Sequence, residues 1–104
     1  MTVSDELLGA VKRELGSTHP DEARDARFKG YIMRGVARLQ EVAGGPLDFS
    51  EGNPNRGLLY EYCRYADAGA LQLFEQNYRS EMVGLNLDGL LDSMIQAEAA
   101  DDED

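Results

Sequence analysis

The chain holds 104 residues, and its 20 acidic and 10 basic side chains give a formal net charge of −10. This length fits one domain, and the excess of acids disfavours adhesion to a nucleic-acid backbone, which needs a basic surface. The single cysteine, Cys63, excludes a disulfide within the chain and suits a reducing cytoplasm. We expect no signal peptide at the N-terminus, and no apolar run approaches the ~20 residues that a membrane span needs.

Two helices are predicted before residue 44. Ser4 is the expected N-cap of the first, and Gly16 is its expected stop. The second is expected to begin near residue 19, with His19 or the residue before it as cap and Pro20 in its first turn. Gly44 and the Gly-Pro pair after it should end this helix.

The second helix carries two different faces when its residues are placed at roughly 100° per step. One face is small or apolar and is expected to be buried: Phe28, Ile32, Gly35, Val36, Leu39, Val42 and Ala43. Beside it lies an arginine stripe, made of Arg24, Arg27, Arg34 and Arg38. The stripe is either a solvated face with local pairs such as Arg38–Glu41, which contribute little, or a basic edge that meets carboxylates of a neighbouring subunit.

A polar loop, PLDFSEGNPNRG, separates this helix from a predicted third helix that runs from about Arg56 to about Ser80. Its apolar arc is unusually wide, which indicates burial on more than one side. The second side of the arc consists of Tyr60, Leu71, Phe74 and Tyr78. Either the C-terminal segment or another subunit is expected to cover it, and aromatic residues favour interfaces. The alternative is that this helix is simply the central helix of the core, where aromatic stripes are more often found.

A short helix and an acidic tail are predicted at the C-terminal end of the sequence. Gly84 is expected to end the third helix, and a short fourth helix is predicted to begin at Asn86 or Asp88. Residues 97–104 are strongly acidic and are expected to be disordered. The sequence therefore predicts one all-α domain over residues 1–96, a small bundle of three long helices plus a short C-terminal helix.

Few residues suggest chemistry. His19 is the only histidine and Cys63 the only cysteine, and nothing around them has the pattern of a metal site or a nucleophile–base pair. We expect Cys63 to be a small core residue. No catalytic, metal or cofactor-binding residue is predicted, and the protein is not expected to be an enzyme.

The order of elements resembles a known family. DEARDARFKGYIMRGVARLQEVAGGP, a polar loop and then LLYEYCRYADAGALQLFEQNYRSEMVGLNL are similar to the head–tail connector, or head-completion, proteins of tailed bacteriophages, over about residues 4–87. The resemblance implies a homo-oligomeric ring of about twelve subunits in the virion neck, built from repeated heterologous contacts. Its implied partners are the portal protein and a downstream neck or tail-completion protein, with DNA passing through the channel without specific binding.

The arginine stripe and the second side of the aromatic helix are the candidate subunit interfaces in this interpretation. An acidic surface also suits a channel through which DNA slides. The alternative from another class is a small acidic binding module, either a nucleic-acid mimic or an inhibitor of a host protein. That alternative explains the charge but leaves the wide apolar arc without a role.

Overall fold

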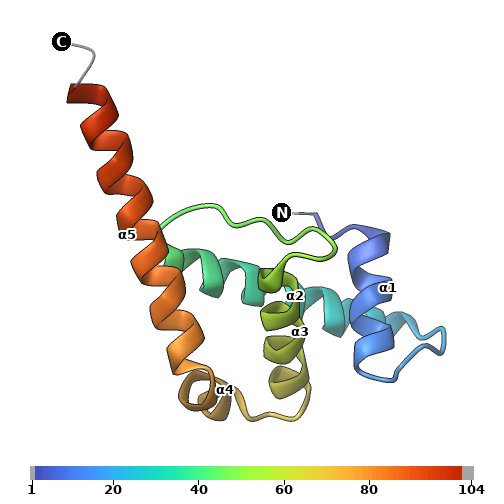
Figure 1. Ribbon diagram of the computed structural model, residues 1–104. Coiled ribbons are helices and arrows are strands. Elements are labelled where there is room, and N and C mark those ends of the chain that lie inside the picture. Colours follow the sequence, from blue (N-terminus) through green and yellow to red (C-terminus); the bar gives the residue numbers. More distant parts are fainter. Residues whose placement is uncertain (1, 102–104) are drawn as a thin grey trace.

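A computed structural model describes the backbone of residues 2–101 and the side chains of residues 2–95. Within residues 2–101 the chain is helical and contains no strand, which confirms the predicted all-α class. The elements are α1 (Asp5–Glu14), α2 (Glu22–Ala43), α3 (Pro54–Asp67), α4 (Leu71–Asn77) and α5 (Arg79–Asp101). Figure 1 shows α2 passing behind α3, while α5 leans against the end of α2 and then projects beyond the body.

The ends of the first two helices follow local capping rules. Ser4 accepts a hydrogen bond from the Leu7 N–H at 3.1 Å, which confirms the predicted cap of α1. The predicted start of α2 is wrong, because Asp21 is its N-cap and accepts from the Arg24 N–H at 3.1 Å. Pro20 therefore precedes the helix. At the other end Gly44 has φ +79°, a left-handed conformation that ends α2 at the predicted place.

The predicted long third helix is wrong: α4 ends at Asn77 before α5 begins, and an earlier break lies at Gly69. That residue has φ +68°, so the backbone turns out of α3 and begins the short α4 at Leu71. The turn brings Phe74 back against α3, where its ring is completely buried and meets Tyr62 edge-on at a centroid distance of 5.3 Å. Burial of a phenyl ring offsets the helical hydrogen bonds lost at the turn.

The core forms where α2 crosses α3, and the predicted face of α2 points into it. A methyl group built at Gly35 would lie 2.7 Å from Leu59 Cδ1 and 2.8 Å from Tyr62 Cδ1, so only glycine permits this close crossing. The largest completely buried side chains are Phe28, Phe74, Ile32, Leu39, Leu59, Val11 and Cys63. The other predicted core positions of α2 are buried or, at Val42, half-buried.

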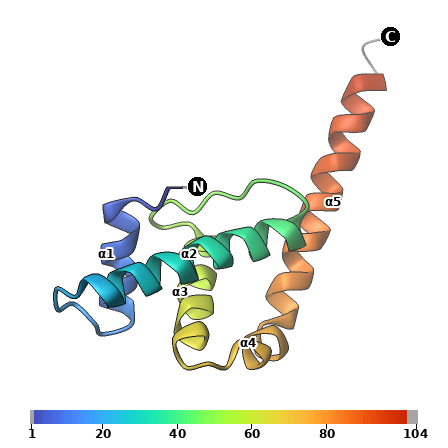
Figure 2. The ribbon, with the colours of Figure 1, turned by 180° about the vertical axis from the view of Figure 1, so that it is seen from behind.

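The C-terminal helix differs most from the prediction. α5 is not a short helix beginning at Asn86 or Asp88 but a continuous helix of 23 residues, and it passes through Gly84 and Gly89 without a break. Met82 is buried and Leu85 half-buried against the core, while the distal half extends past the body (Figures 1 and 2), giving a longest dimension of 57 Å. The predicted tail boundary is not a helix end, because α5 continues to Asp101; residues 102–104 lie outside the described residues.

Candidate functional site

The four aromatic and apolar residues predicted at a subunit interface lie mainly inside the subunit. Phe74 is completely buried, so its assignment to an interface is wrong. Leu71 and Tyr78 are half-buried against the core, and Tyr78 stacks on Phe74 at 5.2 Å. Tyr60 is also half-buried, and its hydroxyl accepts a hydrogen bond from Arg56 Nε at 2.7 Å. The wide apolar arc is covered within the subunit, because α4, which carries Leu71 and Phe74, packs against α3, and α5 packs against α4.

The arginine stripe divides into two kinds of residue. Arg38 donates to both carboxylate oxygens of Glu75 on α4, at 2.8 and 3.3 Å, and to Glu41 at 2.8 Å. The hydrogen bond that Arg38 donates to Glu75 is the main cause that raises the pKa of Arg38 above its ordinary value. Arg27 lies 3.8 Å from Asp67, a loose and half-exposed pair. These two arginines connect α2 to α3 and α4 within one subunit.

Arg24 and Arg34 have a different setting. The Arg34 guanidinium lies over the Tyr31 ring of its own helix, 5.5 Å from the centroid, and its side chain is exposed. Among the side chains that the structure describes, neither Arg24 nor Arg34 forms an ion pair with a carboxylate. Arg34 is therefore the member of the stripe most open to a partner outside the subunit.

A buried arginine at the start of α3 was not singled out by the sequence. Arg56 is only 5% exposed and donates to the Glu6 carboxylate of α1, to the Phe49 carbonyl at 3.3 Å and to Tyr60. The hydrogen bond with Glu6 raises the pKa of Arg56 and lowers that of Glu6. This network joins α1, the polar loop and α3. Glu6 and Arg56 lie 50 residues apart in sequence, so no local pattern marks their pairing.

The single cysteine is a core residue, as predicted. Cys63 is completely buried, and desolvation raises the pKa of its thiol to about 12, which keeps it neutral. His19 is exposed in the turn before α2 and does not cap it. Over the described part of the chain, no group of three or more His, Cys, Asp or Glu residues is placed to hold a metal ion. Nor is any described helix both long and apolar enough to cross a membrane.

The largest exposed apolar surface lies on α5, and we call it the α5 stripe. Its six residues each expose between 50% and 62% of their surface: Val83, Leu87, Leu90, Leu91, Met94 and Ile95. They recur at spacings of three and four, so they share one face of the helix. Met82, Leu85 and Gly89 share the opposite face, and that face rests on the body. The apolar spacing is visible in the sequence, but the short helix predicted there was not assigned to any surface.

One edge of the α5 stripe is acidic. Glu81, Asp88 and Asp92 are exposed and follow each other along the same side of the helix. Monomeric soluble proteins rarely expose a contiguous apolar patch of this kind, and a polar rim around one is typical of a protein interface. The geometry therefore favours the α5 stripe, rather than the aromatic cluster, as the main candidate functional surface.

No family model, curated protein or solved structure significantly matches this chain. The resemblance to phage connector proteins thus remains a prediction from the order and spacing of the sequence segments.

Proposed function

We propose that this protein is a structural subunit of an oligomeric ring, and that the ring is a head–tail connector of a tailed bacteriophage. The observation that carries the proposal is the α5 stripe, an apolar surface of six side chains on the helix face opposite the subunit's own core. Water contact at such a surface is unfavourable, and full burial of each side chain contributes about 1.5–3 kcal/mol relative to exposure. In a monomer these side chains stay in contact with water, so their burial against another protein would be favourable.

The shape of the subunit supports the same function. The body formed by α1–α4 is small, and α5 projects from it as a long arm (Figure 2). An arm with an apolar face suits contact with a second protein, in the manner of an amphipathic helix in a groove. In the connector proposal, α5 joins neighbouring subunits or docks on the portal, and the net negative charge keeps DNA from adhering to the ring.

The alternative is a small acidic binding module, and the observation that favours it is the charge of −10 together with the acidic edge of α5. A nucleic-acid mimic presents carboxylates to a basic partner, and it has no use for six exposed apolar side chains beside them. The α5 stripe therefore favours the ring.

Electron microscopy of concentrated full-length protein tests the proposal. Closed rings of uniform diameter with an open centre are the expected result. A uniform population of compact monomers at the same concentration would overturn the ring and leave the acidic module as the better account. Gel-shift titration with double-stranded DNA is the second arm, in which the connector proposal expects no complex at physiological salt.

A further inference from the structure

We propose that the α5 stripe of one subunit docks on the outer face of α2 in the next copy of this chain. The inference rests on the proposed ring and names its two contacting surfaces. The α2 outer face is the solvent side of that helix, and it contains four small or apolar residues: Ala26, Gly30, Met33 and Ala37. Met33 is 43% exposed, and a methyl built at Gly30 would meet nothing within 4 Å.

The two surfaces match in length. Ala26 to Ala37 spans about 17 Å along α2, and Val83 to Ile95 spans about 18 Å along α5, at a rise of 1.5 Å per residue. The two surfaces are also complementary in shape, because the small side chains on α2 let the larger leucines of α5 approach the α2 backbone. Met33, with a flexible side chain, is the one large residue among them and adapts to its neighbours.

Between Ala26 and Ala37 the charges beside the α2 outer face are basic, with Glu22 and Glu41 beyond its two ends, whereas the charges beside the α5 stripe are acidic. Exposed Arg27 and Arg34 line one edge of the α2 outer face, and Lys29 lines the other. The α5 stripe carries Glu81, Asp88 and Asp92 along a single edge. Viewed down each helix from its N-terminus, the arginine edge of α2 and the acidic edge of α5 lie on the same side of the apolar residues. Packing the two helices face to face and antiparallel therefore brings the arginine edge of α2 against the acidic edge of α5. Arg34, which has no carboxylate partner among the described side chains, then gains one.

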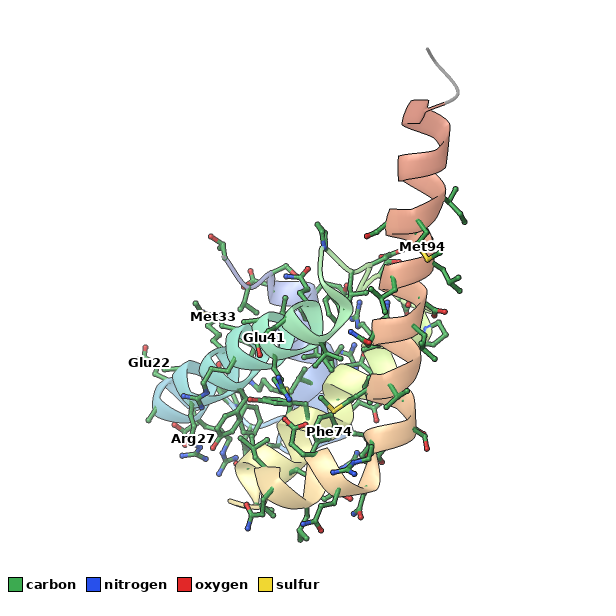
Figure 3. The ribbon with its side chains drawn as sticks, turned by 90° about the vertical axis from the view of Figure 1, so that its left-hand side faces the viewer. Glu22, Arg27, Met33, Glu41, Phe74 and Met94 are labelled. Atoms are coloured by element: carbon green, nitrogen blue, oxygen red, sulfur yellow. The ribbon has the colours of Figure 1, made fainter. Side chains whose placement is uncertain are left out.

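The placement of the two surfaces on different sides of the subunit suits a head-to-tail contact. In Figure 3, Met33 projects from α2 on one side of the molecule and Met94 lies on α5 on the other. A subunit cannot use its own α5 stripe to cover its own α2 outer face, so each copy has one donor and one acceptor surface. Such a heterologous contact generates a ring where the rotation closes. Pairing of two α5 helices would instead stop at a dimer.

Mixing two variants, each defective in one surface, tests this arrangement. The first carries Met33→Glu and Ala37→Glu on α2; the second carries Leu91→Glu and Ile95→Glu on α5. All four positions are exposed, so circular dichroism should show an intact helical fold for both. Ala37→Glu alone serves as the milder α2 variant, should the double change disturb the helix.

The mass of each sample at 0.15 M salt gives the answer. The wild type should assemble, each variant alone should be a monomer, and an equimolar mixture should form a one-to-one heterodimer and nothing larger. If the α2 variants assemble like the wild type, or the mixture stays monomeric, the docking proposal is overturned while the ring stands. If the wild type stays monomeric up to about 1 mM, both the docking proposal and the ring are overturned. A Kd near that concentration corresponds to a binding free energy of only about −4 kcal/mol.

Discussion

The backbone of Gly89 in α5 lies directly against the last residue of α2, Ala43. A methyl group built at Gly89 would sit 1.9 Å from the Ala43 carbonyl oxygen, far inside van der Waals contact. Asn86, one turn earlier, donates from Nδ2 to the Val42 carbonyl at 3.2 Å. These contacts fix the angle at which α5 leaves the body, and so they also fix the direction of the α5 stripe.

Replacing Gly89 by alanine should therefore displace α5 and lower the melting temperature. The helix-propensity gain of about 1 kcal/mol cannot offset a clash with backbone. Gly84→Ala is the matched control: it lies in the same helix, and its new methyl would meet nothing within 4 Å. Thermal unfolding should show stabilisation of roughly 0.5–1 kcal/mol for the control. Equal stabilisation by both changes would contradict the close contact.

The aromatic cluster predicts a second matched pair of variants. Phe74→Ala should destabilise the fold by about 3–5 kcal/mol, because it empties a completely buried ring site. Leu73→Ala, at the adjacent and 45% exposed position of α4, should change stability by less than about 0.5 kcal/mol. Urea unfolding followed by circular dichroism measures both. Similar small losses at the two positions would mean that Phe74 is not a core residue.

The Glu6–Arg56 pair predicts a change in acid stability. The hydrogen bond with Arg56 lowers the pKa of Glu6 below its ordinary value of 4.5, so folding favours the ionised form. The stabilisation is complete above that unfolded-state pKa and is lost as the pH falls through the lower folded-state pKa. Glu6→Gln should destabilise the protein at pH 7, with a smaller difference from wild type at pH 3.

Glu51→Gln is the control for this pH profile, because Glu51 is an exposed loop carboxylate with no ion pair among the described side chains. Its unfolding curve should follow the wild type across the same pH range. A Glu6→Gln variant whose difference from wild type is constant with pH would contradict the linkage.

The parts of the fold that sequence predicted correctly are those governed by neighbouring residues. Ser4 and Gly44 mark helix ends through local hydrogen bonds and a left-handed backbone, and the buried face of α2 follows from spacing. The break at Gly69 depends instead on Phe74 returning to the core, which is a tertiary event. The close approach of Gly89 to Ala43 is likewise a tertiary contact, which no local pattern marks.

The candidate surface was predicted less well than the fold. The aromatic residues near Tyr78 were assigned to an interface because one continuous helix would have left them uncovered, and the turn at Gly69 removes that condition. The α5 stripe was not predicted as a surface. The sequence indicates only a short helix there, and the tertiary structure is needed to show which side of α5 rests on α2 and which side is exposed.

Sedimentation equilibrium of the full chain, comparing wild type with the Leu91→Glu and Ile95→Glu double variant, tests the central claim most directly. Leu73→Glu, an exposed apolar position outside the α5 stripe, is the control. The account predicts concentration-dependent assembly of the wild type and the control, and an 11.5 kDa monomer for the α5 variant with unchanged helical content. Assembly of the α5 variant with wild-type affinity would contradict the claim that this stripe joins the subunits.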